Sequence, residues 1–373
     1  MARESILLAV GDVAPGRADP TSLFTGVRAA LQAGDLVFGQ LEAPVTARGA
    51  RAPHAKLAMR CPPSTAPTLR ATGFDVMSCA GNHCLDWGTE GLEDTLALVK
   101  AGGVQLCGAG LNLEQARLPA FGKCGDAVVA FLAYSSILPD GYWAEARRGG
   151  CAPLRAHTTY EMIEPDQPGT QPRILTHAHA GDLEALLRDV RLARAFADLV
   201  VLSVHWGIHM TPVVIADYQR QIAHAAIDAG VDVILGHHPH ILKGVEFYRD
   251  KPVFYSLGNF AIDPPQVFDP GIIESASFRH LLSLHPGARP DGVYVLPEDT
   301  RHSVIVNLRV SGKRITEVAV QPVWIDDGSV PHALTPADAR FAAVAAYLQD
   351  VSARAGFALR VATDAGRVVL TAG

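Results

Sequence analysis

The chain has 373 residues, of which 49% are hydrophobic and 19% are charged, and its formal net charge is −6 at pH 7. This length and apolar content favour a globular protein with a large buried core, organised as one large domain or two smaller ones. Because the net charge is small and negative, with no block of like charges, the sequence argues against nucleic acid or an anionic membrane surface as a partner.

The beginning of the chain predicts a cytoplasmic protein. After Met1 to Ser5, only about five apolar residues precede Gly11-Asp12, which is too short for the apolar region of a signal peptide or for a membrane-spanning helix. The cysteines form no close CxxC pair and are too sparse for a secreted disulfide scaffold. We therefore expect reduced, mostly buried thiols at Cys61, Cys79, Cys84, Cys107, Cys124 and Cys151.

Short apolar runs, each followed by a turn, predict buried strands at 6–10, 36–38, 76–79, 128–134, 199–204, 231–235 and 253–255. Between these runs, helical patterns occur at 22–33, 91–101, 180–197 and 217–229. This alternation predicts an α/β layered fold. Residues 303–325 alternate around Ser311-Gly312-Lys313 and predict an antiparallel hairpin, and the part from Thr335 onward predicts a helix followed by a weak hairpin.

Two irregular stretches, near 139–173 and 263–300, are rich in proline, glycine and polar residues and are too long to be simple connectors. We interpret them as lid-like insertions that could bind substrate, with functionally neutral insertions as the alternative. Together with the absence of an internal repeat, the pattern predicts a single catalytic domain over residues 1–373.

Three histidines, His237, His238 and His240, directly follow the predicted strand 231–235 and Gly236. Neutral imidazole is the commonest metal ligand, and open α/β sheets place their sites at the carboxyl ends of parallel strands. The cluster therefore predicts part of a metal centre. The alternative is a set of surface histidines in a turn.

Other residues able to ligate a metal or transfer a proton occur at the ends of further predicted strands, and we expect them to converge on the histidine cluster: Asp12, Glu42, Asn82, His83, Asp86 and His205. Mixed carboxylate, amide and imidazole ligands suit one or two divalent ions of Ca, Mn, Zn or Fe. The lack of paired cysteines argues against a structural zinc site.

Six motifs in this order make the chain resemble the CapA-like (poly-gamma-glutamate capsule-type) proteins, a branch of the calcineurin-like metallophosphoesterase superfamily. The motifs are Gly11-Asp12, Gln40-Leu41-Glu42-Ala43-Pro44, Gly81-Asn82-His83-Cys84-Leu85-Asp86-Trp87-Gly88, Val204-His205-Trp206-Gly207, Gly236-His237-His238-Pro239-His240 and Tyr255-Ser256-Leu257-Gly258-Asn259-Phe260. The resemblance implies a four-layer α/β sandwich, in which two packed mixed sheets are flanked by helices and the metal site lies at the C-terminal strand ends.

Motif by motif, the resemblance implies that Asp12 ligates a first ion, that Glu42 bridges two ions, and that Asn82 and His205 ligate a second. The histidine cluster would supply the remaining ligands, and whether His237 or His238 partners His240 stays open, with His238 favoured. The chain departs from the superfamily pattern at Ala14, where a histidine is usual, so the resemblance implies one imidazole ligand fewer at the first ion.

His83 matches the general acid of the superfamily, and Asp86, three residues later, could orient its ring or cap the following helix. The family includes cytoplasmic members that epimerise a residue of a ribosomal peptide, notably the C-terminal residue of lasso-peptide precursors, and this chain is similar to that branch. We therefore predict a metal-dependent isomerase that inverts a peptide Cα by abstraction and return of a proton.

For the second acid–base group we predict Lys56, with a solvated lysine as the simpler interpretation and the Cys84 thiol as a rival. Substrate contacts are expected from Arg60, Trp87, Trp143 and Trp206. A metal-dependent phosphoesterase or other hydrolase is the alternative function, as is a capsule polyglutamate-related protein of the CapA type. A catalytically silent ligand-binding or scaffolding protein is a third class. The expected partner is a peptide substrate, and the oligomeric state stays open.

Overall fold

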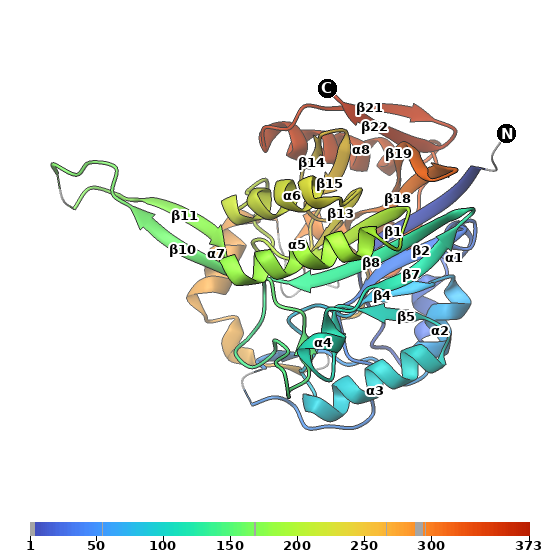
Figure 1. The fold of residues 1–373 in the computed structure, drawn as a ribbon, viewed down its shortest axis with the longest axis horizontal. Helices are drawn as coiled ribbons and strands as arrows, with labels where there is room; N and C mark the ends of the chain where they lie inside the picture. The colour runs from blue at the N-terminus through green and yellow to red at the C-terminus, as the bar shows by residue number, and fades with distance from the viewer. Residues whose placement is uncertain (1–3, 54, 168, 266, 288–293, 295) are drawn as a thin grey trace.

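The computed structural model describes the whole chain apart from residues 1–3, 54, 168, 266, 288–293 and 295. Two mixed sheets pack face to face and are flanked by helices (Figure 1). The predicted sandwich architecture is therefore confirmed. Within the described residues, no helix is both long enough and apolar enough to cross a membrane.

Among the described residues, the larger sheet has ten strands in the order β21-β22-β19-β18-β1-β2-β4-β5, with β16 beside β1 and β20 beside β19. Its strands are β1 (Glu4–Ala14), β2 (Leu36–Leu41), β4 (Val76–Ser78), β5 (Gln105–Cys107), β16 (Asn259–Ile262), β18 (His302–Ser311), β19 (Arg314–Ile325), β20 (Pro331–Ala333), β21 (Leu359–Asp364) and β22 (Arg367–Ala372). The hairpin predicted at 303–325 is confirmed as β18 and β19.

In the part of the chain that the structure describes, the smaller sheet has six strands in the order β14-β15-β13-β12-β8-β7. These are β7 (Ala120–Cys124), β8 (Ala127–Ser135), β12 (Leu199–His205), β13 (Val233–His237), β14 (Val245–Tyr248) and β15 (Lys251–Phe254). Strands β8, β12, β13 and β15 run parallel, so their carboxyl ends meet at one edge.

Three layers of apolar side chains hold the sandwich together, and one of them fills the space between the sheets with residues such as Phe38, Phe131, Val201 and Leu235. A second layer lies between the larger sheet and α1 (Arg28–Leu31), α2 (Thr65–Thr72) and α3 (Gly88–Ala101). The third lies between the smaller sheet and α5 (Ala180–Arg194) and α6 (Asp217–Ala229), while α8 (Ala339–Arg354) packs its apolar side into the inter-sheet layer.

The helix predicted at 22–33 is wrong in its extent. The structure has a 3₁₀ turn at Pro20–Phe24 and a short α1, interrupted at Gly26. A Cβ on Gly26 would lie 2.5 Å from the carbonyl oxygen of Pro331, so the chain passes too close to a neighbouring strand for a regular helix with side chains.

The predicted insertion at 139–173 contains β9 (Gly150–Cys151), which pairs with β6 (Ala109–Gly110), and most of a projecting hairpin formed by β10 (Ala156–Glu161) and β11 (Arg173–Ala178). The insertion at 263–300 contains β17 (Val267–Phe268), which pairs with β3 (Leu57–Ala58), and α7 (Ala276–Leu284). Residues 266, 288–293 and 295 of this insertion lie outside the described part. The remaining elements are α4 (Leu113–Ala116) and 3₁₀ turns at Pro270–Ile272 and Glu298–Arg301.

Candidate metal centre

The candidate site continues the inter-sheet core to its carboxyl edge. Side chains on a strand alternate between faces, so His205 lies on the same face of β12 as the core residue Val201, and His237 lies on the same face of β13 as Leu235. His205 and His237 are register partners on neighbouring strands. On the facing sheet, Gln40 continues the face of Phe38 on β2. Polar groups thus replace apolar ones where the core reaches the strand ends.

Close backbone approach allows Asp12 to join this edge. The Asp12 amide donates to the carbonyl of Gly258 over 3.1 Å, and a Cβ on the preceding Gly11 would lie only 2.0 Å from that same oxygen. Asp12 is also the register partner of Asn259 on β16. Glycine is therefore required at position 11 to bring β1 against the motif that begins at Tyr255.

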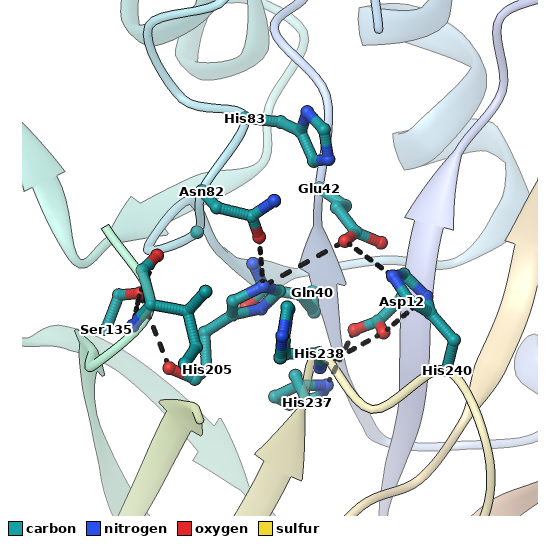
Figure 2. Close-up of polar contacts among 12 residues, drawn as sticks. Asp12, Gln40, Glu42, Asn82, His83, Ser135, His205, His237, His238 and His240 are labelled. Atoms are coloured by element: carbon teal, nitrogen blue, oxygen red, sulfur yellow. Dashed lines mark hydrogen bonds and ion pairs between the residues drawn. The ribbon is translucent and has the colours of Figure 1, made fainter. Parts of the chain in front are cut away.

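The structure brings together most of the metal ligands that the sequence predicts (Figure 2). Ligand atoms of Asp12, Glu42 and His240 all lie within 4.8 Å of one another. Glu42 Oε1 is 3.4 Å from His240 Nε2 and 3.9 Å from His205 Nε2, and the latter nitrogen donates to Asn82 Oδ1 over 2.7 Å. Glu42 therefore lies between two groups of candidate ligands.

His237 and His238 both lie against this cluster, so the structure does not decide which of the two partners His240 as a metal ligand. His237 Nδ1 is 3.2 Å from Asp12 Oδ1, whereas the His238 ring lies 5.0 Å from the His205 ring and its backbone amide donates to Asp12 Oδ2. His238 and His240 both have positive φ angles, 92° and 58°. This uncommon backbone conformation turns the chain after β13 back toward the cluster.

Buried polar atoms without a hydrogen-bond partner in the described structure are concentrated here: Asp12 Oδ1, both carboxylate oxygens of Glu42, His205 Nδ1, both ring nitrogens of His237, and His238 Nδ1. Leaving such groups unpaired in a buried site is costly, and two carboxylates are especially costly. A divalent cation held by these carboxylates and imidazoles would compensate that cost, so the donor set fits a metal ion.

The two carboxylates have opposite pKa shifts. Burial alone would raise the pKa of Asp12, but the facing His237, His240 and His205 lower it overall. Burial and then the neighbouring Asp12 raise the pKa of Glu42 well above its usual range. Burial together with neighbouring imidazoles lowers the pKa of His205 and His238 well below the usual value, which favours the neutral form that ligates metals.

His83 and Asp86 form a buried pair beside the cluster. The Nδ1 of His83 donates to Asp86 Oδ2 over 2.7 Å, and Asp86 also accepts from the backbone amide of Met59 and from the Tyr142 hydroxyl. Burial opposes protonation of His83, but the hydrogen bond and charge of Asp86, together with the charge of Glu42, raise the pKa of His83 overall. The alternative role of Asp86 as a helix cap is wrong, because the N-cap of α3 is Trp87 and has no side-chain hydrogen bond.

The other predicted catalytic and substrate-contacting residues lie in different surroundings. Lys56 is exposed just before β3, and no side-chain contact joins it to the metal cluster in the described structure. Cys84 is buried, and burial raises the pKa of its thiol well above normal, which disfavours proton exchange. The expected substrate contact of Trp206 is wrong, because its ring is fully buried and stacks on Tyr255 in the core.

Two residues that we did not predict contribute to the site. Asn259 Oδ1 accepts a hydrogen bond from His240 Nδ1 over 2.7 Å, and its position in the motif that begins at Tyr255 was the available signal. His209 retains an exposed edge, and its ring lies 5.4 Å from that of His238 and 5.1 Å from that of His240. A second histidine four residues after His205 was its signal in the sequence.

The backbone that carries His209 is held by buried interactions. Lys243 is 2% exposed, and its ammonium donates to the carbonyls of Thr211 and Val214. His285 contacts the carbonyl of Met210 in the same loop. Burial lowers the pKa of Lys243 to about 7.

Comparison with known proteins relates this site to one bacterial family. The family model described as "Bacterial capsule synthesis protein PGA_cap" matches residues 6–264. The chain is 29% identical over 266 residues to "PGA biosynthesis protein CapA" of Bacillus subtilis (strain 168), covering 68% of this chain and 62% of that protein. It is 30% identical over 291 residues to "Probable polyglutamine synthesis accessory protein" of Mycobacterium tuberculosis (strain ATCC 25618 / H37Rv), covering 77% and 68%.

The match to "Capsule biosynthesis protein CapA" of Bacillus anthracis is 28% identical and covers 65% of this chain and 54% of that protein. The chain therefore spans less than two thirds of the length of two of these relatives, 62% of the Bacillus subtilis protein and 54% of the Bacillus anthracis protein. Among solved structures, the calcineurin-like phosphoesterase YfkN from Bacillus subtilis matches with a TM-score of 0.37 at 12% identity, covering 95% of this chain and 98% of that one.

Proposed function

This chain belongs to the bacterial capsule synthesis protein (PGA_cap) family, and we propose that it is a metal-dependent enzyme that acts on a peptide-like substrate. The observation that carries this proposal is the buried pair of carboxylates, Asp12 and Glu42, which face imidazoles and have oxygens without hydrogen-bond partners in the described structure. Such a donor set is typical of a divalent metal site at sheet ends.

The ion would be held by Asp12, Glu42 and His240, whose ligand atoms all lie within 4.8 Å of one another. Asn82, His205 and one or both of His237 and His238 complete the donor set. When bound, a divalent cation supplies positive charge that polarises a substrate carbonyl or holds a carboxylate.

His83 is the proposed acid–base residue beside this centre. Its Nδ1 is committed to Asp86, so Nε2 is the nitrogen that remains for proton exchange with a substrate. Because Asp86 raises the pKa of His83, the ring can hold a proton near neutral pH and give it up to a modest driving force. This is the behaviour that a residue alternating between acid and base requires.

The names of the relatives support a peptide-like substrate, because "PGA biosynthesis" and "polyglutamine synthesis" both refer to chains of amino-acid residues. Within this class we propose inversion at a Cα. In the first step the Cα–H bond breaks, a base takes the proton, and the electron pair moves toward the adjacent carbonyl oxygen. In the second step an acid delivers a proton to the opposite face, so no covalent bond to another group is made or lost.

Epimerisation needs a second proton-exchanging group on the face opposite His83. Lys56 remains the residue that we predict from the sequence, although its exposure requires a substrate or loop to bring it to the centre. His209 is a further candidate, because its ring flanks His238 and His240. Burial of the ring, together with the nearby His240 and His83, lowers the pKa of His209 and leaves a neutral imidazole that can accept a proton.

Hydrolysis is the second candidate function, and the placement of Glu42 favours it. One oxygen of Glu42 lies between His240 Nε2 and His205 Nε2, at 3.4 and 3.9 Å. A carboxylate shared by two groups of ligands is the arrangement that two-metal hydrolases use to activate water against an ester or amide.

One experiment in D₂O separates these functions. The metal-loaded protein is incubated with α-linked and γ-linked glutamate oligomers and with synthetic linear peptides that differ at their C-terminal residue. Epimerisation would incorporate one deuterium at the inverted Cα without cleavage, as measured by mass spectrometry and chiral amino-acid analysis, whereas hydrolysis would yield shorter products. His83→Gln should abolish either reaction, and the exposed Lys123→Gln should not. Neither exchange nor cleavage with any probe would contradict the proposal.

A further inference from the structure

Tyr294, in the insertion at 263–300, reaches the edge of the metal cluster. Its hydroxyl group is hydrogen-bonded to the side chain of Asn259, the residue whose Oδ1 accepts from His240. Because Asn259 is buried, its carbonyl oxygen and its amino group both require partners within the protein. The insertion is therefore connected to a candidate metal ligand through the side chain of Asn259.

The ring of Tyr294 is held by a guanidinium group that is itself fixed. The central carbon of the Arg301 guanidinium lies 3.9 Å from the centroid of the Tyr294 ring. Arg301 is buried, and it donates to the carbonyl of Ile325 at the end of β19 and to the carboxylate of Asp327. A cation placed over an aromatic ring attracts it. The ring of Tyr294 therefore has a defined position, which fixes where its hydroxyl group lies.

The direction of each hydrogen bond in this network follows from its neighbours. The hydroxyl of Thr300 donates to the carbonyl of Pro297 over 2.6 Å, so its oxygen accepts from Tyr294 over 2.8 Å. Tyr294 thus uses its hydrogen on Thr300 and offers a lone pair to the amino group of Asn259. Burial raises the pKa of Tyr294, and the contact with Asn259 acts in the opposite direction, as donation to the phenol oxygen does. The amide of Asn259 is left with Oδ1 toward His240.

The direction of the Asn259 amide determines which nitrogen of His240 carries hydrogen. With Oδ1 toward the ring, Nδ1 is the donor, and a neutral ring then has its lone pair at Nε2, the nitrogen that lies 3.4 Å from Glu42 Oε1. With the amide turned over, its amino group would donate to Nδ1 and the ring hydrogen would be on Nε2. Such a ring could not ligate an ion beside Glu42.

We propose that Tyr294 is a positioning residue for the metal centre: by accepting from Asn259, it holds the tautomer in which Nε2 of His240 can ligate the ion. This inference rests on the proposed function and extends it, because it makes part of the insertion at 263–300 necessary for full metal affinity. Energetic coupling between two sites is reciprocal, so a bound ion should in turn stabilise the turn at Glu298–Arg301.

Titration of the metal-free protein with Mn²⁺ and Zn²⁺, followed by calorimetry, tests this proposal. Tyr294→Phe keeps the ring over Arg301 and removes only the hydroxyl, so it should weaken binding by about threefold to tenfold. Tyr347→Phe is the matched control. It removes a hydroxyl that donates to Asp299 in the same turn, and it should leave the affinity unchanged.

A double variant separates positioning through Asn259 from general damage to the fold. If Tyr294 acts through Asn259, Asn259→Ala/Tyr294→Phe should bind metal as weakly as Asn259→Ala alone. Thr300→Val should also weaken binding, because the hydrogen of Tyr294 is then released to donate to Asn259 and turn its amide over. Losses that simply add in the double variant would overturn the proposal.

Nitrogen NMR of the metal-free protein gives a readout that requires no metal. At alkaline pH, where imidazole is neutral, the wild-type His240 ring should carry its hydrogen on Nδ1, whereas Tyr294→Phe should populate the form with hydrogen on Nε2. An unchanged tautomer, or metal binding by Tyr294→Phe as tight as that of the wild type, would overturn this inference and leave the proposed metal centre standing. A wild type that binds neither ion would contradict the proposed function, and this inference with it.

Discussion

His240 donates a hydrogen bond from Nδ1 to Oδ1 of Asn259 over 2.7 Å, and its Nε2 lies 3.4 Å from Glu42. A histidine that ligates a metal usually has its other ring nitrogen held in this way, because the hydrogen bond fixes the tautomer and the ring orientation. Asn259 reaches this position because β16 pairs with β1, where Asn259 is the register partner of Asp12.

Asn259→Ala should therefore weaken divalent metal binding by about 10-fold to 100-fold, while the other ligands remain in place. Isothermal titration of the metal-free protein with Mn²⁺ and Zn²⁺ measures the effect. Asn307→Ala is the matched control, because Asn307 lies on β18 opposite Leu8, in the middle of β1 rather than at its end. An unchanged metal affinity of the Asn259→Ala variant would show that this hydrogen bond does not orient His240 as a metal ligand.

Removal of the ligands themselves should have a larger effect. We expect Glu42→Ala and His238→Ala to reduce the metal content of the purified protein, because both residues belong to the buried cluster. Elemental analysis provides the readout, and Glu114→Ala, at a residue outside the cluster, is the control. Wild-type stoichiometry in both variants would mean that these residues are not ligands.

Metal removal should destabilise the protein, because Asp12 and Glu42 are then buried together without a counter-ion. The pKa of Glu42 is raised in the fold, so the folded state binds a proton that the unfolded chain has released above its ordinary pKa. Stability of the metal-free protein should therefore fall as pH rises from about 4.5 through the raised pKa.

In the metal-free state, Glu42→Gln should remove this pH dependence and stabilise the fold by about 1–3 kcal/mol at neutral pH. Added metal should stabilise the wild type but not the variant. Urea unfolding with and without chelator, across a pH series, measures both effects. A metal-free Glu42→Gln protein that is no more stable than wild type would contradict the expectation.

Asp86→Asn should lower the pKa of His83, because the hydrogen bond and charge of Asp86 are the main causes that oppose the effect of burial. In the wild type the folded pKa is raised, so the pair stabilises the fold below the ordinary pKa of about 6.5 and loses this contribution as pH rises through the raised value. Titration of the ring by NMR in the metal-free protein gives the shift. Asp94→Asn, which alters an exposed pair with Arg48, should leave the His83 titration unchanged.

The Lys243→Met variant tests what the buried lysine contributes to stability. This lysine binds the backbone of the loop that carries His209. The pKa of Lys243 is lowered by burial to about 7, so between this value and about 10.5 the unfolded chain binds a proton that the folded chain does not. Its contribution to stability should therefore rise with pH across this window, by a few kcal/mol in order of magnitude.

The difference in unfolding free energy between wild type and Lys243→Met, measured from pH 6 to about pH 10, should follow this rise. The exposed Lys123→Met should show no such dependence. A pH-independent difference between wild type and Lys243→Met would indicate an ammonium with an ordinary pKa. Loss of metal affinity in the same variant would show that this loop helps to position the metal centre, since Lys243 binds the loop backbone at Thr211 and Val214.

The sequence alone was sufficient to identify the central strands of both sheets, and it predicted most of the residues that the candidate centre brings together. Apolar runs such as 199–204 and 231–235 became β12 and β13, each extended to the histidine at its end. Because side chains on a strand alternate with a period of two, His205 and His237 necessarily share the core-facing side of Val201 and Leu235. The motifs also determined membership of the capsule synthesis family, which the match over residues 6–264 confirms.

Only the tertiary structure decided how the residues beyond the strand ends are directed. The period of a strand no longer applies after His237, and His238 and His240 take positive φ angles, which are uncommon for residues other than glycine. The contact of Asn259 with His240 depends on β16 pairing with β1, which is set by the backbone approach at Gly11 rather than by local pattern. The composition of this region likewise did not predict the projecting hairpin of β10 and β11. Its Tyr160–Ile174 face is exposed and does not pack on the core of its own chain, so no burial pattern marks the two strands in the sequence.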